Sequence, residues 1–245
     1  RANTSGSLNT AVGVDSLLSN LTGTGNVGVG YQALNSNTTG SSNTAIGWIS
    51  AYNNTTGSDN TSMGTGSFNS NTTGGSNVAI GNSALRYNST GSFNVAVGKD
   101  ALQVNTASNN TAVGYQAGYS NTSGDITAFG YRALYLNSTG LYNTSIGVQA
   151  LRNNTIGNDN IAIGVNSLYN NSAGINNLAI GNSSLFQNQG SNNIAVGHEA
   201  LYNNASTSGN VAIGYQAAYS NLANSNTIIG YQAGKNNTSG NITCL

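Results

Sequence analysis

One short block of residues, of the form Asn-Thr-Ala-Val-Gly, returns along the whole chain and constrains its fold more than any other feature. The glycines that close the block follow one another at intervals of 16 or 17 residues. They are Gly13, Gly30, Gly47, Gly64, Gly81, Gly98, Gly114, Gly130, Gly147, Gly164, Gly181, Gly197, Gly214 and Gly230. Such a repeat is typical of a solenoid, in which each copy forms one coil and buries its apolar side against neighbouring coils. We number the positions of the unit 1 to 17 from the first Asn of the block.

Apolar residues recur in fixed columns of this unit. Position 2 is Thr, Val, Ile or Leu, position 3 is usually Ala, position 4 is always apolar and position 9 is mostly Leu. The alternation over positions 1 to 5 predicts a short strand, and the glycine at position 5 permits a sharp turn after it. Positions 8 to 11 fit a second short strand or a single helical turn. We favour the strand, because 17 residues accommodate two short strands and two turns.

The sequence therefore predicts an all-β fold, a parallel β-solenoid (β-roll) of about fourteen 17-residue coils, with positions 4 and 9 in two inward-facing aliphatic stacks. We expect a single repeat array over residues 1–245, with a partial coil at 1–8, coils over 9–240 and a partial coil at 241–245. In the last of these, Cys244 falls at position 4. Every change in repeat length falls between position 12 and the next position 1, which predicts a loop there.

Two columns of the repeat are asparagine. Position 1 is Asn except at Ile126, and position 12 is Asn in every copy. An amide at the same corner of each coil can bond the next amide along the axis, so we expect a structural ladder. N-glycosylation is the alternative for nine of these residues, which stand in N-x-S/T triplets. The other five keep Asn without the hydroxyl residue, which favours the ladder. The ladder residues are Asn20, Asn37, Asn54, Asn71, Asn88, Asn105, Asn121, Asn137, Asn154, Asn171, Asn188, Asn204, Asn221 and Asn237.

Charge is scarce, and its placement excludes several functions. The 6 basic and 6 acidic residues cancel, so the chain lacks the basic footprint of a nucleic-acid-binding protein. No apolar run is long enough for membrane insertion. Charged residues avoid positions 2, 4, 8 and 9, as expected if these positions face inward. His198 and Glu199 are adjacent but lie at outward positions, and the acids sit on distant coils. We therefore assign no catalytic, cofactor-binding or metal-ligating residues and expect no enzyme.

Aromatic residues are the most suggestive candidates for recognition. They gather at position 6, after the turn, and a second set of tyrosines occupies position 10. Rows of Tyr beside Asn and Gln can bind a glycan or a protein of a host surface. Packing over the roll or along a seam between chains is the alternative that we favour. The candidate recognition residues at position 6 are Tyr31, Trp48, Tyr115, Tyr131, Tyr215 and Tyr231.

Blocks such as Asn77–Gly81 and Asn210–Gly214 resemble the N-S-V-A-I-G motif of trimeric autotransporter adhesin heads, and the fuller unit Asn26–Gly40 is similar to repeats of bacteriophage tail-fibre proteins. The resemblance covers nearly the whole chain. It implies a left-handed β-roll that forms a homotrimer outside the cell, on a virion fibre or a cell surface. The expected function is a rigid structural or adhesive section of such a fibre, without a cofactor, in contact with host-surface glycan or protein.

Two further functions fit the repeat. Neither end of the sequence reads as a cap, and open solenoid ends tend to pair, so a subunit of a self-stacking, head-to-tail extracellular filament is the alternative. Ice binding is less favoured. Some antifreeze proteins are β-rolls with N-x-V-x-G units, but a flat ice-binding face requires Thr in register, and position 2 is Thr in only seven copies.

Overall fold

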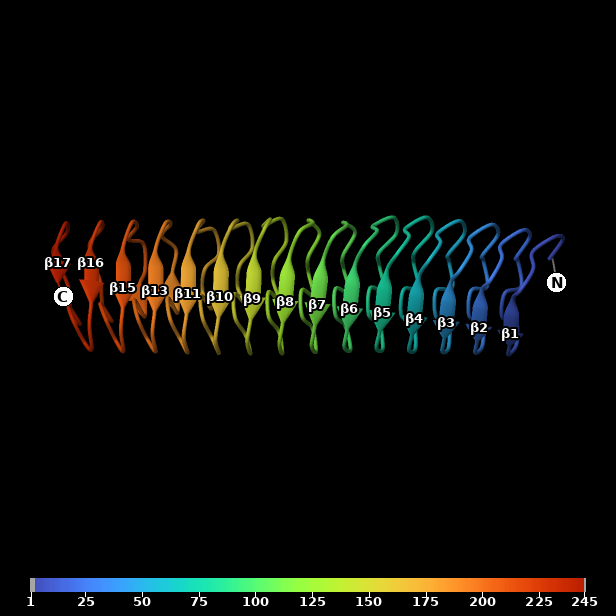
Figure 1. The fold of residues 1–245 in the computed structure, drawn as a ribbon, viewed down its shortest axis with the longest axis horizontal. Helices are drawn as coiled ribbons and strands as arrows, with labels where there is room; N and C mark the ends of the chain where they lie inside the picture. Colours follow the sequence, from blue (N-terminus) through green and yellow to red (C-terminus); the bar gives the residue numbers. More distant parts are fainter. Residues whose placement is uncertain (1–2, 245) are drawn as a thin grey trace. The chain divides into compact units, whose positions relative to one another are not determined.

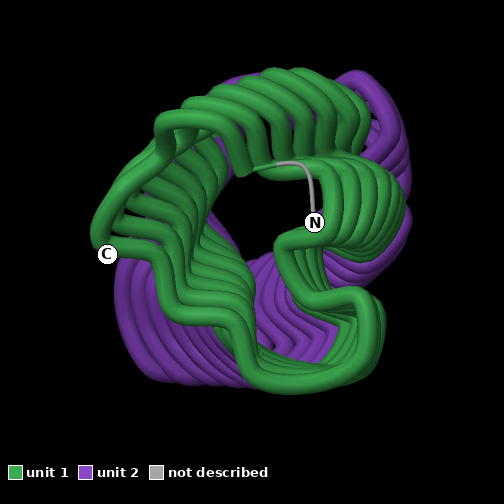
Figure 2. The backbone as a smooth tube through the Cα atoms, turned by 90° about the vertical axis from the view of Figure 1, so that its right-hand side faces the viewer, with its two compact units in different colours: residues 1–125 green, residues 126–245 purple. Residues whose placement is uncertain are grey.

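The computed structural model describes residues 3–244, and within them it contains short parallel strands and no helix. It is an all-β parallel β-solenoid of about fourteen coils of about 17 residues, which confirms the predicted fold class. The chain forms two compact units, residues 1–125 and 126–245. Within unit 1, successive coils follow a common path (Figure 2).

Each coil contributes one short strand to the sheet of its unit, three residues long except for the two-residue β17 (Figure 1). In unit 1 the strands are β1 (Thr10–Val12), β2 (Val27–Val29), β3 (Thr44–Ile46), β4 (Thr61–Met63), β5 (Val78–Ile80), β6 (Val95–Val97) and β7 (Thr111–Val113). In unit 2 they are β8 (Thr127–Phe129), β9 (Thr144–Ile146), β10 (Ile161–Ile163), β11 (Leu178–Ile180), β13 (Ile194–Val196), β15 (Val211–Ile213), β16 (Thr227–Ile229) and β17 (Thr243–Cys244). A separate pair consists of β12 (Gln187–Asn188) and β14 (Asn203–Asn204).

Register between neighbouring coils is set one repeat apart. Ala45 lies opposite Ser62 and Ile46 opposite Met63, and the other strands of each unit pair likewise. The glycines at position 5 have φ between 123° and 138°, a region that only glycine enters freely. A Cβ on Gly47 would lie 2.7 Å from the carbonyl oxygen of Gly64 in the next coil. The turn after each strand therefore requires glycine for its backbone angle and for the close approach of coils.

The orientation of the strands corrects one prediction. From β2 to β16 position 3 is buried, whereas positions 2 and 4 are half-buried or exposed. Ile163, at position 4, is 36% exposed, and Ala162 beside it is 0% exposed. Alternate residues of a strand point to opposite faces, so the small residue faces the interior and its apolar neighbours face outward. The inward stack predicted at position 4 is wrong. The stack predicted at position 9 is correct, because Leu34, Leu85 and their equivalents are fully buried.

The narrow interior explains why the small residue faces inward. At Gly28, which takes position 3 in its coil, a Cβ would lie 2.5 Å from the Ser16 hydroxyl oxygen and 3.4 Å from Leu17 Cγ. Where position 9 is leucine, positions 8 and 9 fill the space beneath the strand, so little more than a methyl group fits there; Ile228 is accommodated at position 3 beside Gly234. The absence of charge at positions 8 and 9 therefore reflects burial, whereas its absence at positions 2 and 4 marks an outer apolar face.

Positions 8 to 11 also differ from the prediction. They form turns, and a strand touches this segment only at Gln187 and Asn203, which begin β12 and β14. Leu34, at position 9, has φ 52°, and the left-handed region is incompatible with a strand. Axial hydrogen bonds persist nonetheless, since the Leu34 N–H donates to the Ser50 carbonyl of the next coil at 3.1 Å.

The shorter repeats lose one residue from the turn after position 12. The side chain of Asn54 bonds the carbonyl three residues later, at Gly57, whereas that of Asn105 bonds the carbonyl two residues later, at Ala107. The same shortening shifts the last coil. Strand β17 places Cys244 opposite Ile228, which is position 3, so the expectation that Cys244 lies at position 4 is wrong.

Candidate functional surfaces

The position-12 asparagines are buried and bonded to one another along each unit. Asn54 is typical: its Nδ2 donates to Asn37 Oδ1 at 2.8 Å and to the Gly57 carbonyl at 2.9 Å. Its Oδ1 accepts from Asn71 Nδ2 at 2.6 Å. The amide thus bonds the coil before it, its own turn and the coil after it. A buried primary amide has this bonding capacity in both directions, and a carboxylate or an aliphatic residue does not.

The same bond recurs along both units. Its length runs from 2.6 to 3.5 Å between Asn20 and Asn121 in unit 1, and from 2.7 to 3.2 Å between Asn137 and Asn237 in unit 2. All fourteen residues are 8% exposed or less. A glycan on Nδ2 would replace a ladder donor and has no space in the folded chain, so burial argues against glycosylation of this column.

A second ladder runs through position 1 and meets the first. Asn26 Oδ1 accepts both the backbone N–H and the side-chain Nδ2 of Asn43, at 2.9 and 3.2 Å. Asn43 Nδ2 also donates to the Gly57 carbonyl at 2.8 Å, the oxygen that Asn54 bonds from the other column. The two columns therefore meet at this carbonyl, which is position 15 of its coil, and the same pair of hydrogen bonds recurs at the carbonyls of Gly40 and Gly74. Ile126, which is 1% exposed, takes the position-1 place in its coil and offers no amide.

The six candidate recognition residues at position 6 are exposed, from 36% for Tyr115 to 74% for Tyr231. In unit 2 the ring of Tyr215 stacks between His198 and Tyr231, with centroids 5.3 and 5.2 Å apart. In unit 1 the Lys99 ammonium lies 5.7 Å from the Tyr115 ring centroid. Both faces of Tyr215 are thus covered by other rings, so its edge and hydroxyl are the parts that an incoming molecule meets.

A longer aromatic stack runs along position 10 of unit 2. The rings of Tyr169, Phe186, Tyr202 and Tyr219 follow one another with centroids 5.0 to 5.1 Å apart. Burial raises the pKa of the Tyr219 hydroxyl above its usual value, and the charge of Glu199 adds to the rise. The sequence places tyrosines in this column, but the stack needs the coil spacing and the shared turn conformation, which only the structure supplies.

The described residues were also searched for an acid–base pair, a metal site and a membrane-spanning helix. His198 Nδ1 lies 3.7 Å from a carboxylate oxygen of Glu199, which also accepts from Gln216 Nε2 at 2.6 Å. Among the described residues, no three His, Cys, Asp or Glu side chains gather as a metal site requires. No helix in residues 3–244 has the length and apolar character to cross a membrane.

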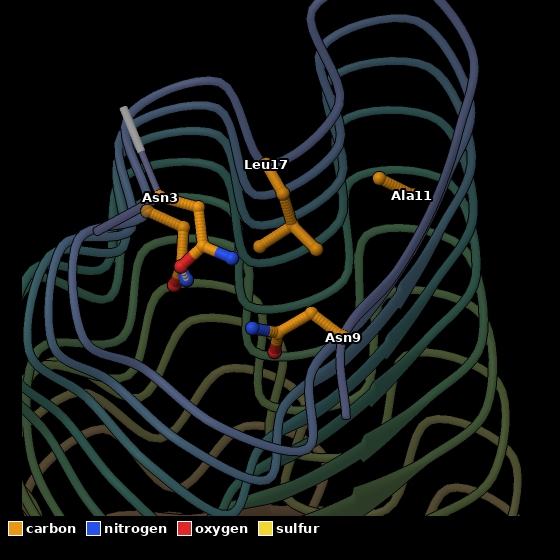
Figure 3. A pocket seen from close by; sticks show the side chains of 5 residues that line it. Asn3, Asn9, Ala11 and Leu17 are labelled. Atoms are coloured by element: carbon orange, nitrogen blue, oxygen red, sulfur yellow. Dashed lines mark hydrogen bonds between the residues drawn. The ribbon is translucent and has the colours of Figure 1, made fainter. Parts of the chain in front are cut away.

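One cavity, of about 270 Å³, lies at the first described coil (Figure 3). It is lined by Asn3, Asn9, Ala11, Leu17 and Asn20. These residues belong to the interior columns 1, 3, 9 and 12, which adjacent coils cover elsewhere. The cavity is therefore the open cross-section of the coil rather than a cleft built for a ligand.

Comparison with protein-family models, with curated proteins and with solved structures found no match.

Proposed function

We propose that the chain is a rigid structural section of an extracellular fibre, of the kind found in phage tail fibres and trimeric surface adhesins. The observation that carries the proposal is the pair of buried amide ladders, which share carbonyl acceptors such as that of Gly57. Coils are joined to their neighbours by backbone bonds and by the position-12 column and, except at Ile126, by the position-1 column. Bending or sliding one coil breaks several of these bonds together, so the array resists deformation. The resemblance of the Asn-Val-Ala-Ile-Gly blocks to fibre repeats supports an extracellular site.

Immunogold electron microscopy of the native source tests the proposal. Antibodies raised against the purified chain are expected to label fibres on virions or on the cell surface. The matched control is the same antibody adsorbed with excess purified chain, which must abolish the label. Gold confined to the cell interior, with none on surface fibres, contradicts the proposal.

The position-6 column adds an adhesive role to the proposed fibre. Tyr31 and Trp48, on neighbouring coils of unit 1, are 46% and 52% exposed, and aromatic side chains with a polar tip are common anchors at interfaces. Binding of the purified chain to host-surface glycan or protein preparations should fall when both residues are replaced by Ala. Tyr142→Ala is the control, since Tyr142 is 59% exposed outside this column. Equal binding by all three chains rejects the adhesive role and leaves the structural role in place.

A further inference from the structure

Two guanidinium groups share one tyrosine ring in unit 2. The Cζ atom of Arg152, at position 10, lies 5.4 Å from the ring centroid of Tyr135 in the preceding coil and 5.7 Å from that of Tyr169 in the following coil. The Cζ atom of Arg132, at position 7 in the coil of Tyr135, lies 5.3 Å from the same Tyr135 centroid. We call Arg132 and Arg152 the arginine pair. It concentrates two positive charges in a chain that has few charges.

A row of side-chain amides runs beside the arginine pair. It consists of Asn153, Asn170 and Gln187, which occupy position 11 of three consecutive coils, and we call it the amide row. Asn153 Nδ2 donates to Asn170 Oδ1 at 2.7 Å, and Asn170 Nδ2 donates to Gln187 Oε1 at 3.1 Å. Asn153 Oδ1 accepts from Arg152 Nη1 at 3.0 Å, which joins the row to the arginine pair. Unlike the ladders at positions 1 and 12, this row is half-buried or exposed.

We propose that the arginine pair and the amide row form a binding site for an acidic polysaccharide, whose sulfate or carboxylate group pairs with the guanidinium groups. The inference rests on the adhesive part of the proposed function and names a ligand class for it. The site lies at positions 7, 10 and 11 of unit 2, apart from the exposed aromatic residues at position 6.

The charge of Arg152 has no counter-charge in the part of the chain that the structure describes. Its Nη1 donates to Asn153 and to the Tyr169 hydroxyl, the latter at 3.2 Å, and its Nε is buried without a hydrogen-bond partner. No carboxylate of residues 3–244 forms an ion pair with it. Removing a charge from water is costly unless an opposite charge compensates, and ring faces compensate only in part. An oxyanion from outside the chain supplies what is missing, and Nη2 is not shut off from solvent.

The acids of unit 2 leave this positive charge in place. Glu199 lies three coils beyond Arg152, about 14 Å along the axis at the strand spacing. That separation exceeds the Debye length of about 8 Å at physiological ionic strength. Asp159 is exposed at position 17, in the turn before β10, and forms no ion pair with Arg152. An approaching anion therefore meets the arginine pair without a carboxylate bound to Arg152.

The polar groups beside the arginine pair favour a polysaccharide over an acidic peptide. Each sugar unit carries hydroxyl groups, and side-chain amides and tyrosine hydroxyls both donate to and accept from such groups. The amides recur at the coil spacing, so a polymer can bond several of them in succession. Peptides that bind along a sheet usually bond the main chain of an open edge. Here the backbone N–H groups of Asn153 and Asn170 already bond the carbonyls of Tyr169 and Phe186 in the next coil.

Unit 1 contains an arginine that lacks these surroundings. Arg86 also occupies position 10, lies 5.5 Å from the ring centroid of Tyr87, and has a buried Nε without a partner. Position 11 is Tyr87 in its own coil and Val104 in the next, so no amide row runs beside it. Arg86 is therefore the matched control for the site.

Fluorescence anisotropy of the full chain with four labelled probes tests the inference: chondroitin sulfate, unsulfated chondroitin, neutral dextran and polyglutamate. Wild type should bind at least one of the two chondroitins, and should bind dextran and polyglutamate at least about 10-fold more weakly. Equal affinity for the two chondroitins assigns the contact to a carboxylate, and preference for the sulfated form assigns it to a sulfate. Arg152→Gln should weaken chondroitin binding by about 10-fold or more, because a hydrogen bond between charged groups is lost. Arg86→Gln removes the same charge in unit 1 and should change the affinity by less than about 2-fold.

Arg132→Gln decides the matter if Arg152→Gln does not fold, and should weaken binding about 5-fold through the loss of the second charge. Circular dichroism checks the fold of every variant. The inference is overturned by a wild type that binds neither chondroitin, by folded arginine-pair variants that bind like wild type, or by an Arg86→Gln chain that loses as much affinity as they do. Equal binding of dextran rejects the role of charge, and equal binding of polyglutamate assigns the site to an acidic peptide instead. A chain that binds none of the probes but still labels surface fibres rejects the inference and leaves the proposed function standing.

Discussion

Replacing Asn54 by Ala removes one rung of the position-12 ladder in the middle of unit 1. Three hydrogen bonds disappear: those to Asn37 Oδ1, to the Gly57 carbonyl and from Asn71 Nδ2. The Gly57 carbonyl keeps a donor, since Asn43 Nδ2 still reaches it at 2.8 Å. Asn37 Oδ1 and one N–H of Asn71 lose the partner that this rung gave them, at a site where both residues are 0% exposed.

The cost follows from those two buried polar groups. Leaving a buried donor or acceptor without a partner costs about 1 to 3 kcal/mol, so we expect the free energy of unfolding to fall by about 3 kcal/mol. The matched control is Asn53→Ala in the same coil. Asn53 is half-buried, and its backbone N–H bonds the Asn69 carbonyl, a contact that Ala keeps. A change of less than about 0.5 kcal/mol is expected there.

Urea denaturation followed by circular dichroism measures both variants. A defect in one coil can uncouple neighbouring coils of a solenoid and broaden the transition. Amide hydrogen exchange therefore supplies a local reading, for example at Thr55, whose N–H bonds the Thr72 carbonyl across the affected rung. If Asn54→Ala shifts the midpoint and the local exchange no more than Asn53→Ala does, the ladder does not stabilise the array and the reasoning fails.

Gly47→Ala should destabilise the chain by at least about 2 kcal/mol, from a left-handed φ of 132° and a Cβ 2.7 Å from a carbonyl oxygen; an unshifted melting temperature contradicts this. Ala79→Ile should cost about 1 to 3 kcal/mol by overpacking the interior, whereas Val78→Thr on the outer side should be nearly neutral in the same melt, and the reverse order would invert our strand orientation. Tyr219 holds its proton more tightly in the folded chain than the unfolded value of about 10, so its contribution to stability is complete below pH 10 and is lost as pH rises through the raised pKa. Tyrosinate absorbance of wild type minus Tyr219→Phe checks that titration, and a midpoint at or below 10 refutes it. We expect no thermal hysteresis in freezing assays, because both outward positions are aliphatic from β10 to β15 and interrupt any regular threonine array.

The repeat itself carries most of what the sequence could predict. The period, the solenoid and the strand over each Asn-Thr-Ala-Val-Gly block follow from spacing alone. The shortened turn after Asn105 could also be placed, because every length change falls between two fixed asparagine columns. A residue type that recurs at the same position of fourteen coils indicates the role of that position, even where the sequence of a single coil would fit several structures, because all coils must make the same contacts.

The repeat does not predict which face of the strand points into the coil. Alternation of apolar and small residues fits either face, and the usual rule that the larger apolar residue points inward fails in a coil this narrow. Ile163 is outward because Ala162 already fills the available space. Nor does any propensity predict leucine with φ near 50° at position 9, as at Leu85; the residue accepts that conformation because its side chain is fully buried there.

The outward strand residues and the left-handed leucines have a common cause, which is the narrow interior of the coil. A coil whose interior holds two amide columns, one leucine and small residues has no room for the strand's aliphatic side chains; Ile228 is buried at position 3 in a coil whose position 9 is Gly234 rather than leucine. The amide ladders that join coil to coil thus displace the apolar residues to the outside, where a single chain cannot bury them. A chain built in this way gains stability along its axis from the amides and leaves apolar area open at its side.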